Sequence, residues 1–212
     1  LEGLETLAIG DAESRVDVLA TLAPYLTAAQ RDEALTHGLA ASQANENELR
    51  RAEMLAALAP NLTGHLREQA LTQGLEAVQA IEHEEARPNA LAALAPDLMG
   101  EFLMQGLAAA LAIEAEWHRA AALAALAPQL TGELLEEGLE AAAAIEDEGH
   151  RADVLVALAP NLTGRELKEG LTAALVMEDE ESRAAVLTAL APKLTGELLA
   201  QGFEAARAIE DE

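Results

Sequence analysis

Apolar residues recur along the chain at intervals of three and four, the spacing that places them on one face of an α-helix. Between residues 135 and 145 this face consists of Leu135, Gly138, Leu139, Ala142 and Ile145. A second face follows after a short acidic turn and includes Leu155 and Leu158. The pattern predicts two consecutive helices, which run to about residue 145 and to about residue 159.

The predicted helix pair is repeated along the whole chain. The tripeptide Leu-Ala-Pro ends each unit, with spacings of 36, 36, 32, 32 and 32 residues between Pro24, Pro60, Pro96, Pro128, Pro160 and Pro192. A period in the thirties is typical of helical solenoids. We therefore expect an all-α fold: a right-handed α-solenoid of antiparallel helix pairs, about six and a half repeats and 13 helices, forming a single domain over residues 1–212.

Signals for the ends of the helices recur with the repeat. A Leu-Thr pair precedes the first helix at Thr27, Thr63, Thr131, Thr163 and Thr195, and we expect the threonine hydroxyl to cap that helix. Asp147 and its equivalents Asp11, Asn47 and Asp179 are expected to cap the second helix, and the proline ends it. Four extra residues in 27–38 and in 63–74 predict two first helices that are longer by about one turn.

Fixed positions within the repeat predict the packing. A glycine recurs within the first helix at Gly3, Gly38, Gly74, Gly106, Gly138, Gly170 and Gly202. Glycine costs a helix about 1 kcal/mol relative to alanine, so we expect the backbone of a neighbouring helix to approach it closely; approach by a ligand is the alternative. We expect two buried columns of leucine: Leu19, Leu55, Leu91, Leu123, Leu155 and Leu187, and Leu22, Leu58, Leu94, Leu126, Leu158 and Leu190.

The unit AIEDEGHRADVLVALAPNLTG at residues 144–164 resembles the tandem helical repeats of large bacterial proteins, which are similar to tetratricopeptide and HEAT arrays. The repeats of this chain are also similar to one another, and in this they resemble the consensus repeat scaffolds used for engineered binders. The Trp-Leu-Gly-Tyr hallmark of the tetratricopeptide family is missing. The resemblance implies protein–protein recognition and brings no catalytic residues.

Charge and composition narrow the range of partners. The chain has 13 Lys and Arg against 38 Asp and Glu, a formal charge of −25, which disfavours nucleic acid and anionic membranes. A charged partner is therefore expected to be basic. There is no cysteine, no basic leader and no apolar stretch near the roughly 20 residues that span a bilayer. We expect a cytoplasmic protein.

The polar residues offer little chemistry. Arg15, Arg51, Arg87, Arg119, Arg151 and Arg183 share one repeat position, and we expect a structural ladder that bridges carboxylates of its own and the adjacent turn; the alternative is a track for phosphate or carboxylate groups. The histidines lack ligand spacing, and the acidic turns lack the glycine of a calcium loop. We expect no catalytic residues, no metal and no cofactor.

The positions that vary between repeats suggest a binding surface. They lie on one face of the second helix, opposite its leucines, and include Leu49, Arg50, Glu53, Trp117, His118, Gly149, His150 and Asp153. A variable stripe on a regular scaffold is how solenoids recognise partners; the alternative is neutral drift on a solvated face. We expect a non-enzymatic scaffold that binds protein or peptide. The alternatives are a structural spacer or ring, and an enzyme with a pocket between helices.

Both ends of the sequence carry the apolar pattern of interior repeats without a polar cap. These residues are Leu4, Leu7 and Ile9 at one end, and Leu198, Leu199, Phe203 and Ile209 at the other. An uncapped solenoid exposes an apolar face. We therefore expect the two ends to associate head to tail, against the repulsion of the net charge.

Overall fold

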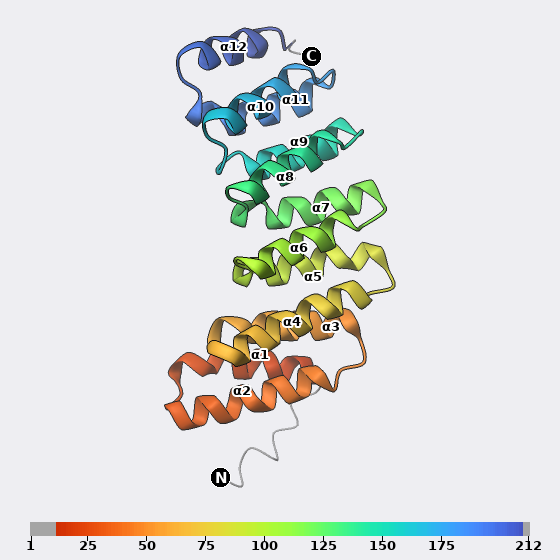
Figure 1. Ribbon diagram of the computed structural model, residues 1–212, viewed down its shortest axis with the longest axis vertical. Coiled ribbons are helices and arrows are strands. Elements are labelled where there is room, and N and C mark those ends of the chain that lie inside the picture. Colours follow the sequence, from red (N-terminus) through yellow and green to blue (C-terminus); the bar gives the residue numbers. More distant parts are fainter. Residues whose placement is uncertain (1–11, 210–212) are drawn as a thin grey trace. The chain divides into compact units, whose positions relative to one another are not determined.

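The computed structural model describes residues 12–209, and this part of the chain contains twelve α-helices and no strand (Figure 1). The helices are α1 (Ala12–Leu22), α2 (Ala28–Gln43), α3 (Glu48–Leu58), α4 (Gly64–Ala80), α5 (Arg87–Leu94), α6 (Glu101–Leu111), α7 (Glu116–Leu126), α8 (Glu133–Ala143), α9 (Glu148–Leu158), α10 (Gly164–Leu175), α11 (Glu180–Leu190) and α12 (Gly196–Arg207). The predicted all-α fold of helix pairs is confirmed. The thirteenth predicted helix and the cap at Asp11 lie outside the described residues.

The chain forms two compact units, residues 1–102 and 103–212, which divide within α6. We call the even-numbered helices A helices and the odd-numbered helices B helices. In the first unit α3 packs against α1, α2, α4 and α5; in the second unit α9 packs against α7, α8 and α11, and α10 packs against α8, α11 and α12. Each unit is thus a stack of A–B pairs. The single domain over 1–212 stays a prediction.

The extra turn in two A helices is confirmed. Helices α2 and α4 have 16 and 17 residues, whereas α8, α10 and α12 have 11 or 12. Each B helix that precedes a Leu-Ala-Pro tripeptide ends at the leucine of that tripeptide. In five of these connections a 3₁₀ turn follows, with the proline as its second residue, as in Ala59–Asn61. The proline therefore redirects the chain inside an ordered turn.

The caps of the B helices match the prediction, and most of those of the A helices do not. Asn47, Asp147 and Asp179 each accept a hydrogen bond from the backbone N–H three residues later. The prediction of a threonine cap is wrong at Thr63, Thr131, Thr163 and Thr195, where no side chain caps the helix. A glycine follows each of these threonines, with φ between +49° and +57°, and turns the chain into the helix. Thr27 lacks that glycine; its N–H and hydroxyl donate to Gln30 Oε1 at 3.3 and 2.8 Å.

The fixed glycines receive leucine side chains, so the expected approach by a helix backbone is wrong in detail. A Cβ atom on Gly38 would lie 2.8 Å from Leu58 Cδ2, and one on Gly170 would lie 2.7 Å from Leu162 Cδ1. The source of the leucine depends on the length of the helix. The long helices α2 and α4 take it from the following B helix, whereas the short helices α8, α10 and α12 take it from eight residues earlier in the chain. We call this feature the glycine socket.

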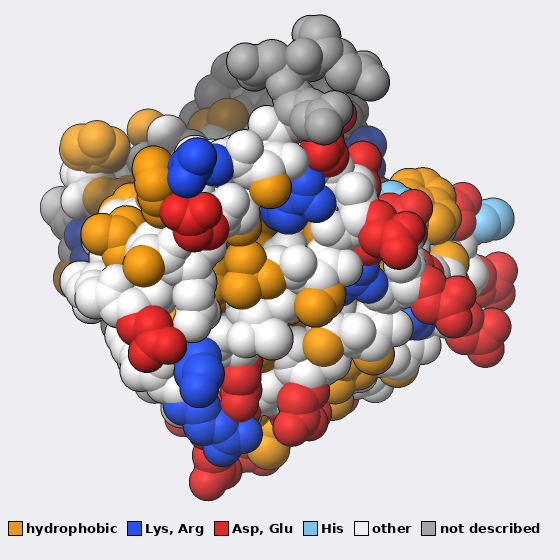
Figure 2. Space-filling view, turned by 90° about the horizontal axis from the view of Figure 1, so that it is seen from above, with side chains coloured by type: hydrophobic (Ala, Val, Ile, Leu, Met, Phe, Trp, Pro, Cys, Tyr) orange, Lys and Arg blue, Asp and Glu red, His pale blue; other side chains and the backbone are white. Residues whose placement is uncertain are grey.

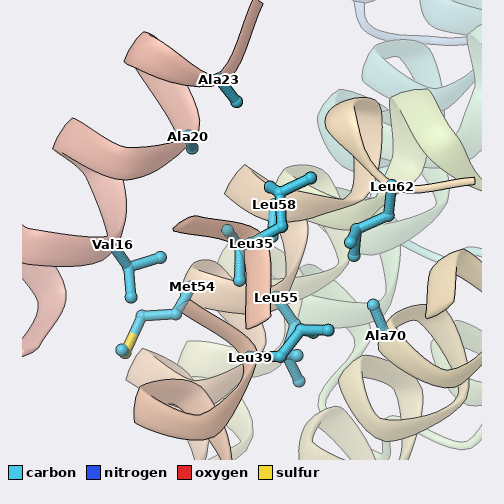
Figure 3. Packing of buried hydrophobic residues seen from close by; sticks show 10 residues of the cluster. All are labelled: Val16, Ala20, Ala23, Leu35, Leu39, Met54, Leu55, Leu58, Leu62 and Ala70. Carbon is cyan, nitrogen blue, oxygen red and sulfur yellow. The ribbon is translucent and has the colours of Figure 1, made fainter. Parts of the chain in front are cut away.

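The predicted leucine columns are buried in the interior repeats. Leu55 and Leu58 are fully buried beside Leu35 and Leu39 (Figure 3), and the equivalents at 91, 94, 123, 126, 155, 158, 187 and 190 are also buried. The prediction is wrong for the first repeat, where Leu19 is only half-buried and Leu22 is 46% exposed. The equivalent glycine there is Gly3, which lies outside the described residues. Within residues 12–209 no helix is long and apolar enough to cross a membrane.

Candidate binding surfaces

Two open grooves lie between consecutive A helices. The groove between α2 and α4 has a volume of about 510 Å³ and is lined by Gln43, Arg51, Gln73, Glu76, Ala77 and Ala80. The groove between α10 and α12 has a volume of about 480 Å³ and is lined by Leu175, Glu197, Ala200, Gln201, Glu204 and Ala205. Concave surfaces of this size are the usual places where proteins bind ligands and peptide side chains.

The two grooves occupy the same place in the repeat. Counted from the glycine of its own helix, Gln43 is equivalent to Leu175, since both lie five residues after it. The other wall is equivalent as well: Gln73 and Gln201 precede their glycine by one residue, Glu76 and Glu204 follow it by two, and Ala77 and Ala205 follow it by three. A groove with these shared positions therefore recurs in both units.

The groove is lined by apolar and by polar side chains. Alanine methyl groups, glutamine and glutamate are common to both grooves. In the first unit Gln43 Nε2 donates to Gln73 Oε1 at 3.2 Å across the groove. In the second unit Leu175 replaces that glutamine, and Glu197 and Glu204 are the charged lining residues. Such a surface accommodates small apolar side chains together with a cation.

The predicted stripe on the B helices is only partly a surface. Trp117 is 56% exposed, and Arg50, Gly149 and Asp153 are exposed as well. Leu49, Glu53 and His150 are half-buried. His118 is only 7% exposed, so its place on an exposed stripe is wrong.

The residues at the position of His118 differ in burial from one B helix to the next. At the equivalent position Arg50 is exposed and reaches back to the preceding B helix, where its Nη1 lies 2.7 Å from Glu13 Oε1. Ser182 is buried to the same extent as His118, whereas His150 is half-buried. The His118 ring stacks on Trp117 with centroids 3.5 Å apart. Neither ring nitrogen of His118 has a hydrogen-bond partner among the described residues.

The arginine ladder joins the two helices of one repeat. Five arginines donate to the backbone carbonyl six residues earlier, at 2.7 to 3.0 Å: Arg51, Arg87, Arg119, Arg151 and Arg183. Four of them also lie 3.0 to 3.9 Å from the glutamate three residues earlier in the chain. The carbonyls belong to the turn that follows the preceding A helix. Arg15 is exposed.

Glutamates, rather than these arginines, make the contact with the following turn. Glu116 accepts from the backbone N–H groups of Glu146 and Asp147 at 2.9 and 3.1 Å. Glu148 accepts from the N–H of Asp179 at 2.6 Å while its other oxygen faces Arg151 at 3.0 Å. These N–H donors lower the pKa of both glutamates, because they stabilise the carboxylate.

A second link between repeats lies at the residue after the proline, which the sequence patterns did not single out. Asn161 Nδ2 donates to the carbonyls of Ala127, Pro128 and Leu130 in the preceding repeat, at 2.9 to 3.1 Å. Asn61 donates to Ala20 O at 3.0 Å in the same way. The sequence carries one signal for this link: asparagine follows Leu-Ala-Pro twice, at Asn61 and Asn161.

The titratable side chains that the structure describes form no cluster suited to a metal ion. Within 12–209 no group of three or more His, Asp or Glu side chains is arranged to hold a metal ion. No family model, no curated protein and no solved structure matches this chain. Any function must therefore be argued from the surface itself.

Proposed function

We propose that this protein is a non-enzymatic scaffold that binds a basic segment of another protein in the grooves between its A helices. The observation that carries the proposal is the recurrence of one groove, at one register, in both units. In the same proposal the chain is a bacterial solenoid of the tetratricopeptide or HEAT type and acts in the cytoplasm.

The chemistry of the groove indicates the kind of segment. Alanines leave room for small or unbranched side chains, and Glu76 or Glu204 offers a carboxylate to Lys or Arg at the wall. The net charge of −25 favours the encounter with a basic partner over long distances. Recurrence adds avidity, because a partner with two such segments can occupy two grooves at once.

Selection from a random peptide library on the immobilised protein tests the proposal. We expect the selected peptides to be enriched in Lys and Arg and to bind more weakly at high salt. Ala80→Leu and Ala200→Leu place a larger side chain in each groove at an exposed position, and should reduce binding about tenfold for each.

Ala121→Leu is the matched control, because Ala121 is an exposed alanine on the B helix α7 and lies outside both grooves. Trp117→Ala tests the stripe on the B helices. Peptides without basic residues would contradict the proposal, and so would binding that is lost in Ala121→Leu or Trp117→Ala but kept in both groove variants.

A further inference from the structure

Helix α12 leaves exposed the face that the other A helices of its unit bury. The equivalent residues in α10, Leu167 and Leu171, are 7% and 1% exposed. In α12 the same positions are held by Leu199 and Phe203, which are 50% and 59% exposed. Figure 2 views the structure from above relative to Figure 1, from the side on which α12 lies, and shows hydrophobic side chains at the centre of this face with charged side chains around them.

The neighbouring repeats show what covers such a face. Helices α8 and α10 each pack against the B helix that follows them, α9 and α11. A leucine of that B helix lies over the glycine socket: Leu158 Cδ2 is 3.8 Å and Leu190 Cδ2 is 3.9 Å from a Cβ atom built on Gly138 and Gly170. At Gly202 no leucine of a following B helix is present among the described residues; the neighbours of its Cβ position are Leu194 and Leu171.

A B helix with an open face is found on the same chain. In α1, Val18 and Leu22 are 40% and 46% exposed, whereas Met54 and Leu58 at the same positions of α3 are 1% and 0% exposed. Leu22 is equivalent to the leucine that fills the socket in α2 and α4. The exposed faces of α12 and α1 are therefore the two halves of one type of contact.

We propose that α12 of one molecule docks on α1 of a second copy, with Leu22 lying over the filled socket at Gly202, as Leu158 and Leu190 lie over theirs, and Phe203 covered by α1. The contact repeats one that the chain already makes between its own A and B helices. It joins two different surfaces, so each copy retains one free half and the association continues from copy to copy. The contact goes beyond the proposed binding of basic segments, since neither face includes a residue of the α2–α4 or α10–α12 groove.

Residues 1–11 are predicted from the sequence to supply a further A helix ahead of α1. Such a helix would compete with α12 of a second copy for the same face. We therefore expect removal of residues 1–11 to strengthen the association. Weaker association after the removal would contradict the proposal.

Sedimentation velocity of the full chain tests the contact directly. We expect species larger than the monomer at high protein concentration, and more of them as salt rises from about 0.01 to about 1 M, because the Debye length falls from about 30 to about 3 Å. The charge of −25 is then screened while the apolar contact is kept. A protein that stays monomeric across this range would overturn the proposal.

Two charge variants identify the faces by complementation. Phe203→Glu blocks α12 and Leu22→Glu blocks α1; both sites are exposed, so the helical circular dichroism should not change. Each variant alone should be monomeric, and an equal mixture should form a dimer and nothing larger, since only one compatible pair of faces remains. Association of either variant alone, or a mixture that stays monomeric, would count against the proposal.

Leu175→Glu is the matched control, because it adds the same charge in the α10–α12 groove. It should leave self-association unchanged, because Leu175 belongs to neither of the two docking faces. Loss of self-association in Leu175→Glu would refute the assignment to α12. The self-association proposal and the proposed function therefore fail in separate assays.

Discussion

Two leucines at one position of the repeat are expected to differ in their contribution to stability. Leu58 and Leu22 each end a B helix and precede Ala-Pro, but Leu58 is fully buried and Leu22 is 46% exposed. Their pattern in the sequence is the same, so any difference in the free energy of unfolding comes from packing. Replacing each by alanine measures that difference within one protein.

The expected magnitudes follow from burial. Complete burial of a leucine side chain stabilises a protein by about 2 kcal/mol, and the cavity left by truncation brings the cost of a buried Leu→Ala change to about 2–5 kcal/mol. Leu58 lies 2.8 Å from the Cβ position of Gly38, so its loss also empties the glycine socket. We expect about 3–4 kcal/mol for Leu58→Ala. Leu22→Ala removes about half of that transfer term and leaves no closed cavity, so we expect less than about 1 kcal/mol.

Urea unfolding followed by circular dichroism measures both values. At low protein concentration and low salt the monomer should prevail, so that contacts between copies do not contribute for Leu22. Because repeats couple mainly to their neighbours, the slope of the transition should be compared as well as its midpoint. Equal losses of unfolding free energy in the two variants would refute the expectation that burial at this position determines how much the leucine stabilises the protein.

Four further substitutions test the local contacts. Gly164→Ala, at φ +49°, and Gly170→Ala, where the new methyl group would lie 2.7 Å from a buried leucine, should each destabilise the protein by about 1–2 kcal/mol in thermal unfolding, although alanine is the better helix former. Glu148→Gln should lose more stability at pH 7 than at acidic pH: the N–H of Asp179 lowers the pKa of Glu148 below its unfolded value, so the stabilisation is present at neutral pH and is lost as the pH falls through the folded pKa. Asn161→Ala should cost about 1–3 kcal/mol in urea unfolding, because it leaves carbonyls of the preceding repeat without their donor.

The sequence was sufficient for those features that depend on periodicity. Helix pairs, their order and the longer helices α2 and α4 follow from the spacing of apolar residues and of proline. The capping role of Asp147 also followed, because a carboxylate at that position needs only the local backbone. The sequence also carries a signal for a positive φ, because a glycine follows four of the five Leu-Thr pairs that precede an A helix, as at Gly132 and Gly164.

The features that depend on packing could not be predicted in the same way. A helical wheel places His118 on the outer face, but the face that becomes buried depends on how successive B helices lean on one another. The grooves could not be predicted, because Gln73 and Glu76 line a groove only where a second A helix lies beside them, and in the sequence they are ordinary surface residues. The difference between Leu22 and Leu58 arises from neighbours, which a repeat pattern does not distinguish.

The direction of the bonds between repeats gives the array a chemical polarity. At the acidic turns and after the prolines of the second unit, the later repeat supplies the N–H donors and the earlier repeat supplies the oxygens, as in Asp179 to Glu148 and Asn161 to Ala127. In the second unit, a repeat that loses its successor therefore keeps oxygens to be solvated at these two places, which water and cations do readily. A repeat that loses its predecessor leaves backbone N–H groups without their carboxylate. Removing repeats from the two ends of such an array therefore has unequal effects. Removal that leaves oxygens exposed is the better tolerated of the two.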